Sequence, residues 1–92
     1  MPAALTTAER FERAEAALAE ARRLAESITE ETPGRQRAAL ITKTRTQYNK
    51  AYSVLGRIRR QRNPAAADDK ARAERILDQI WEQIGHARRF SQ

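Results

Sequence analysis

Apolar side chains in this chain recur at alternating steps of three and four residues, in three separate stretches. This spacing places them on one stripe of an α-helix, and such a stripe must pack against other helices to leave water. The stripes consist of Phe11, Ala14, Leu18, Ala21, Ala25 and Ile28, then Ile41, Thr44, Tyr48, Ala51, Leu55 and Ile58, then Ala73, Leu77, Ile80, Ile84 and Ala87. The chain is therefore predicted to be all-α with heptad-like seams.

Polar residues and prolines mark the ends of these stretches. Thr6, with a glutamate three residues later, has the spacing of a capping box, so the first helix is expected to begin there. Thr32 before Pro33 and Asn63 before Pro64 each combine an N-cap residue with a proline at the first helical position. A residue before proline also disfavours helical backbone, so the second helix is expected to end at Asn63.

The predicted helices cover residues 6–31, 33–62 and 64–90 of a single domain, 1–92. Their similar lengths and very short connections favour antiparallel neighbours, hence an up-down-up three-helix bundle. The alternative is a long helical hairpin or rod that buries its stripe by dimerising.

Charge is distributed unevenly along the chain. Residues 33–67 contain nine lysines and arginines and no aspartate or glutamate, whereas the net charge of the whole chain is +6. A solvated helix ordinarily mixes both signs and gains from pairs at i and i+4. A cationic segment without acids therefore predicts a surface for an anionic partner.

On a helical wheel of residues 33–62, five of these cations lie opposite the apolar stripe, together with hydroxyl and amide side chains. Lys43, Lys50 and Arg57 are spaced by sevens and form a nearly straight row. The antiparallel topology brings the end of the third helix beside the start of the second. The predicted polyanion-binding residues are Arg35, Lys43, Thr46, Lys50, Ser53, Arg57, Arg60, Arg88 and Arg89. The alternative is a plain solvated face whose cations complement the helix dipole.

Three aromatic residues lie at or outside the edges of the seams. Tyr52 and Trp81 flank their stripes, and we expect the neighbouring helix to cover them. Phe90 lies outside the third seam and is expected to be exposed. If the partner is a protein, these three residues are the candidate interface anchors.

The chain offers no pattern typical of an enzyme. His86 is the only histidine and there is no cysteine, so neither a nucleophile–base pair nor a set of metal ligands is indicated, and no cofactor is expected. No apolar run approaches the ~20 residues that span a bilayer, and the first residues do not resemble a secretory signal. We therefore expect a cytoplasmic protein that has no small-molecule substrate and does not bind membranes.

These observations favour a non-enzymatic helical module that binds a nucleic-acid backbone, free or in a ribonucleoprotein, without reading its sequence. The alternative is a protein–protein interaction module, such as an adaptor, an inhibitor or an accessory subunit, that docks on an acidic protein surface. Homo-oligomerisation is left open.

Overall fold

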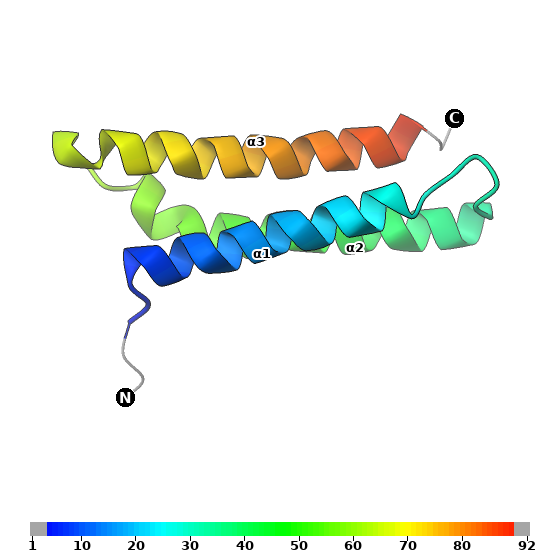
Figure 1. Ribbon diagram of the computed structural model, residues 1–92, viewed down its shortest axis with the longest axis horizontal. Coiled ribbons are helices and arrows are strands. Elements are labelled where there is room, and N and C mark those ends of the chain that lie inside the picture. Colours follow the sequence, from blue (N-terminus) through cyan, green and yellow to red (C-terminus); the bar gives the residue numbers. More distant parts are fainter. Residues whose placement is uncertain (1–3, 90–92) are drawn as a thin grey trace.

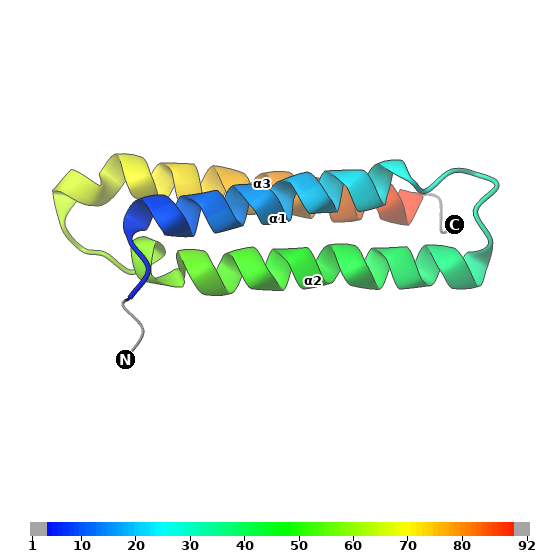
Figure 2. The ribbon, with the colours of Figure 1, turned by 60° about the horizontal axis from the view of Figure 1, so that its bottom comes forward.

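The computed structural model describes residues 4–89. Its helices are α1 (Thr7–Glu26), α2 (Gly34–Arg59) and α3 (Ala67–Arg89), and a short 3₁₀ turn, η1 (Pro64–Ala66), leads into α3. The helices run up, down and up, and each packs against the other two (Figures 1 and 2). The predicted antiparallel three-helix bundle is thus confirmed, in an elongated form that measures 47 × 30 × 15 Å.

The capping box at the start of α1 is confirmed. The Thr6 hydroxyl accepts a hydrogen bond from the Glu9 backbone N–H at 3.1 Å, and the Glu9 carboxylate accepts one from the Thr6 N–H at 3.0 Å. The box satisfies two backbone N–H groups at the helix start, and so fixes where α1 begins.

The first helix ends at Glu26, earlier than predicted. The Ser27 hydroxyl donates to the Leu24 carbonyl at 2.7 Å, and the Thr29 N–H donates to the Thr32 hydroxyl at 2.9 Å. Short polar side chains that bond to nearby backbone compete with helix. Thr32 is therefore engaged in the loop, and the prediction that it caps α2 is wrong: the N-cap is Pro33, without a side-chain cap.

The other two boundaries are closer to the prediction. The second helix ends at Arg59 rather than at residue 62. Asn63 does act as an N-cap, since its side-chain oxygen accepts a hydrogen bond from the Ala65 N–H at 3.0 Å, although the turn that it caps is 3₁₀ rather than α.

The core follows the predicted stripes. All six predicted α1-side residues, from Phe11 to Ile28, are buried, and so are Ala51, Leu55 and Ile58 of α2. Thr44 is buried too, and its hydroxyl donates to the Leu40 carbonyl at 2.8 Å, which satisfies the one buried polar side chain of this seam. Many of these positions are alanine, so the core is thin and the three helices stand close together.

Candidate nucleic-acid interface

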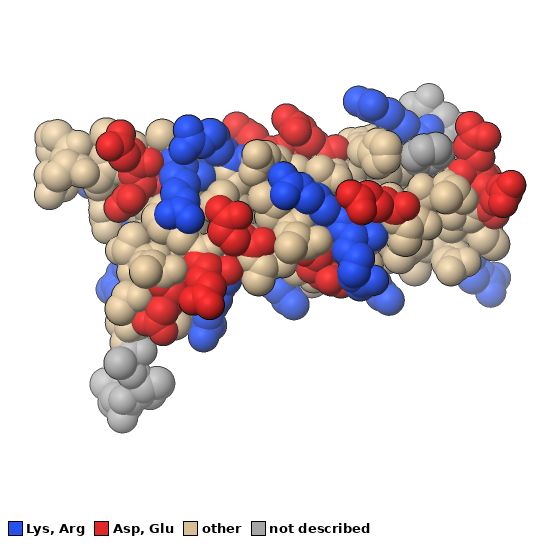
Figure 3. All heavy atoms as spheres, viewed as in Figure 1, with Lys and Arg blue, Asp and Glu red and all other residues tan. Residues whose placement is uncertain are grey.

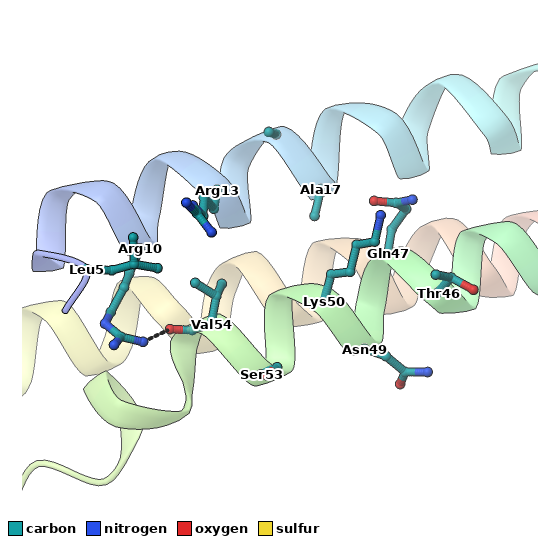
Figure 4. Close-up of a pocket in the computed structure, with 11 residues that line it drawn as sticks. Leu5, Arg10, Arg13, Ala17, Thr46, Gln47, Asn49, Lys50, Ser53 and Val54 are labelled. Atoms are coloured by element: carbon teal, nitrogen blue, oxygen red, sulfur yellow. Dashed lines mark hydrogen bonds between the residues drawn. The ribbon is translucent and has the colours of Figure 1, made fainter. Parts of the chain in front are cut away.

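An open groove of about 810 Å³ lies between α1 and α2. Its walls combine cations with uncharged polar side chains from both helices. In Figure 4, Arg13 extends from α1 and Lys50 from α2 into the space between the helices. Asn49 and Ser53 lie on the outer side of α2, along the rim of the same groove. Cations beside amide and hydroxyl groups can both neutralise and hydrogen-bond phosphate oxygens.

Arg10 closes one end of this groove. Its Nη1 donates a hydrogen bond to the Val54 carbonyl at 3.0 Å, in a half-buried position (Figure 4). The bond holds the first turns of α1 against the last turns of α2. Arg10 therefore contributes positive charge from a fixed position, whereas Arg13 and Lys50 extend freely.

The central row of the predicted site is exposed. Lys43, Lys50 and Arg57 all project into solvent. Within residues 4–89, the ion pairs join Arg23 to Glu20, Arg59 to Glu74 and Arg72 to Glu15. No carboxylate of the described chain is thus ion-paired with a member of the row.

One acid, Glu20, does lie at the groove. It lines a smaller depression with Lys43, Thr46 and Gln47, the last two of which also line the main groove. Its carboxylate is bonded to Arg23, whose Nε lies 2.9 Å from Oε2. This hydrogen bond lowers the pKa of Glu20, and the charges of Lys50 and Lys43 add smaller contributions in the same direction. The Glu20 carboxylate thus interacts electrostatically with Lys43 and Lys50 but is hydrogen-bonded to Arg23.

The hydroxyl of Thr46 has a backbone partner. It donates to the Thr42 carbonyl at 3.1 Å, one turn earlier in α2. Its single hydrogen is therefore directed into the helix, and Thr46 would have to rotate to donate to a phosphate. Ser53 is exposed on the groove rim, which makes it the better-placed hydroxyl of the two.

The structure does not bring all of the predicted residues together. Arg35, Arg88 and Arg89 are exposed at the end of the bundle where α3 ends and α2 begins. The exposed acids Glu30 and Glu31 lie in the loop that leads into α2 at this same end, so it carries both signs. These three arginines are therefore a weaker anion site than the groove.

Arg60 belongs to another face. It lines a hollow with Tyr52, Gly56 and Glu74, on the side of α2 that faces α3. Its guanidinium covers Gly56, which is buried rather than exposed on the outward side of α2 as its place on the wheel indicated.

The prediction that Tyr52 and Trp81 are covered by neighbouring helices is wrong. Tyr52 is 50% exposed and Trp81 is 56% exposed. Both rings adjoin that of half-buried Tyr48 at the α2–α3 seam. Phe90 lies outside the described residues.

The α1 wall of the groove was not predicted from the sequence. Arg10 and Arg13 belong to a segment in which acids outnumber cations, so the charge count gave no signal there. A helical wheel of α1 would have placed both on one flank of its seam.

Figure 3 shows the face formed by α1 and α3, over which cationic and acidic side chains alternate.

Other kinds of site find no support in residues 4–89. This part of the chain holds no cluster of three or more potential metal-binding histidines, cysteines, aspartates or glutamates. No helix in the same range is long and apolar enough to cross a membrane. Comparison with protein-family models, curated proteins and solved structures gives no significant match.

Proposed function

We propose that the α1–α2 groove binds the backbone of a nucleic acid without reading its sequence. The observation that carries this proposal is the exposed row of Lys43, Lys50 and Arg57, none of which forms an ion pair with a described carboxylate. Arg13 adds a further cation from the opposite wall. The protein is thereby a binding module, and no catalytic step is assigned to it.

The dimensions suit this ligand. From Lys43 to Arg57 the row runs about 21 Å along α2. Each strand of a duplex carries one phosphate per ~3.4 Å of the duplex axis, so the row spans about six base pairs. A strand winds through more than half a turn over that length, so only some of its phosphates face the row at once. Contacts to these phosphates do not depend on the base sequence.

The groove offers little for base recognition. Its outer donors are the short side chains of Asn49 and Ser53, on a long helix packed along its neighbours rather than one crossing them. Helices that read bases project a short recognition segment into the major groove. Contacts to phosphates alone supply affinity and no sequence information.

Salt dependence is the direct test. With a fluorescent 20-base-pair duplex, a complex in which about five phosphates are neutralised has log K falling with log salt at a slope near −4.5. The variant K43Q/K50Q/R57Q should bind much more weakly and with a slope shallower by about 2.7. Two duplexes of unrelated sequence should bind equally.

The matched control is R22Q/K70Q/R75Q, which removes the same charge from α1 and α3, away from the groove. Equal loss of affinity in both variants would show that only net charge matters. A slope near zero for the wild-type protein would remove a nucleic-acid backbone as the ligand. Binding to a labelled poly-glutamate chain in preference to the duplex would favour the alternative, an acidic protein surface.

A further inference from the structure

The α1–α2 groove has an apolar floor, although its walls are cationic. Buried Ala17 and half-buried Val54 line it. In Figure 4, Ala17 points from α1 and Val54 from α2 into the space between the two helices. A phosphate gains nothing from apolar surface, whereas a ligand that covers this surface with apolar groups of its own binds more tightly. The floor therefore favours a ligand that has apolar faces as well as negative charge.

Access to this floor depends on the width of the ligand. Packed helices have their axes about 8–10 Å apart, so the opening between α1 and α2 is narrow. The major groove of a duplex alone is about 12 Å wide, and the bases of a duplex are paired inside it. A duplex can therefore lay one backbone along the mouth of the groove, but it cannot bring a base to Ala17 or Val54. An unpaired strand can turn its bases toward the floor.

The cations are placed so that a strand in the groove meets positive charge from both walls. Arg13 extends from α1 and Lys50 from α2 (Figure 4). No acidic side chain within residues 4–89 lines this groove, although Glu20 lines the adjoining depression. Proteins that bind single strands without sequence preference combine a cationic groove with surfaces that cover the bases. Here that surface is aliphatic, so the bases are held by burial rather than by aromatic stacking.

We infer that the nucleic acid that occupies the groove is a single strand. Its phosphates contact the cations of both walls, and its bases cover the floor formed by Ala17 and Val54. This inference rests on the proposed function, because it names the form of the nucleic acid that is bound at the same site. Exposed Tyr52 and Trp81 take no part in it, since neither residue lines the groove.

Titration of a strand and of a duplex tests this inference. A 20-nucleotide oligothymidylate and the 20-base-pair duplex are compared at the same salt concentration. A duplex carries twice the charge per unit length, so charge alone favours the duplex. Covering roughly 40 Å² of apolar surface adds about fivefold in affinity, so the oligothymidylate should bind at least about fivefold more tightly than the duplex. An abasic strand of the same length should lose this advantage.

Ala16 allows a variant that changes the groove but not its charge. It is exposed and lines the groove, so Ala16→Gln places a longer polar side chain there. This variant should lose the preference for the oligothymidylate and keep its affinity for the duplex. Ala19→Gln makes the same change at an exposed α1 position that lines neither the groove nor the adjoining depression, and it should bind like the wild type. Circular dichroism checks that both variants remain helical.

The failure of this inference differs from the failure of the proposed function. A duplex that binds as tightly as the oligothymidylate, or an abasic strand that binds equally well, would overturn the inference and leave backbone binding in place. A large loss of oligothymidylate binding in Tyr52→Ala or Trp81→Ala would also overturn it, because the strand would then lie on the α2–α3 face. A protein that binds neither nucleic acid, or that prefers poly-glutamate to both, would overturn both proposals.

Discussion

Arg10 Nη1 donates a hydrogen bond to the main-chain carbonyl of Val54 at 3.0 Å, which ties the first turns of α1 to the last turns of α2. Replacing Arg10 by Met keeps most of the aliphatic stem and removes the bond. We expect the free energy of unfolding to fall by about 1 kcal/mol, the usual net value of such a bond. Urea unfolding measures this. Arg22→Met, at an exposed α1 position, is the control, and an equal loss in both variants would mean that the bond to Val54 contributes nothing specific.

Glu20 lines the same depression as Lys43, and its charge opposes an incoming phosphate. Glu20→Gln should therefore tighten binding of a duplex by about 1.4- to fivefold, the range that corresponds to a surface charge interaction of about 0.2–1 kcal/mol. It also releases Arg23, which the carboxylate holds. The measurement is the same salt-controlled titration as for the cation variants.

Glu12 is an exposed α1 acid that lines neither the groove nor the depression beside Glu20. Glu12→Gln removes the same charge as Glu20→Gln and is therefore its matched control. If the two variants bind equally tightly, the anion does not occupy the part of the groove near Glu20.

Glu9 makes the stability of the fold depend on pH. Hydrogen bonds from the Thr6 backbone, and next from its hydroxyl, lower the pKa of Glu9 from its ordinary value of 4.5. A carboxyl with a lower pKa in the folded chain stabilises the fold when ionised, and this contribution is lost as the pH falls through the folded pKa. Glu9→Gln retains the acceptor oxygen and cannot titrate.

The wild-type chain should therefore exceed Glu9→Gln in stability at neutral pH, and the gap should close below pH 4.5. Urea unfolding of the two chains across this range gives the difference, in which the other carboxyls cancel. A gap that stays constant down to about pH 2 would show that the carboxylate adds nothing to the cap beyond its shape.

Two glycines inside helices give a paired prediction about stability. An added Cβ at Gly85 meets no atom within 4 Å, so Gly85→Ala should raise the free energy of unfolding by 0.5 to about 1 kcal/mol. At Gly56 the added carbon would lie 3.1 Å from the Arg60 guanidinium. That side chain is exposed and can move, so Gly56→Ala should stabilise by a smaller amount. Thermal unfolding at low protein concentration ranks the two, and a destabilising Gly56→Ala would mean that Arg60 is held in place.

The buried stripes could be predicted because periodicity is a local property. The spacing that predicted a helical stripe placed Phe11, Ala51 and Ile80 in the core, where the structure has them. The same spacing predicted that the helix continues through Ile28, which is buried but lies beyond the end of α1. The hydroxyls of Ser27 and Thr29 form hydrogen bonds with nearby backbone groups, which compete with the helix. The spacing of apolar residues does not predict such bonds.

The site was harder to predict because it depends on the handedness of the bundle. Three antiparallel helices can close with the third on either side of the first two, and a broad apolar stripe fits both arrangements. Whether the row at Lys50 borders α1 or α3 follows from that choice, so Arg13 could not be paired with it beforehand. A wheel gives the direction of a side chain such as Trp81, but not how far the next helix covers it.

The α1–α2 groove lies on a different side of α2 from the exposed rings of Tyr52 and Trp81. A nucleic acid bound in the groove, as proposed, would therefore leave both rings uncovered and able to contact another molecule.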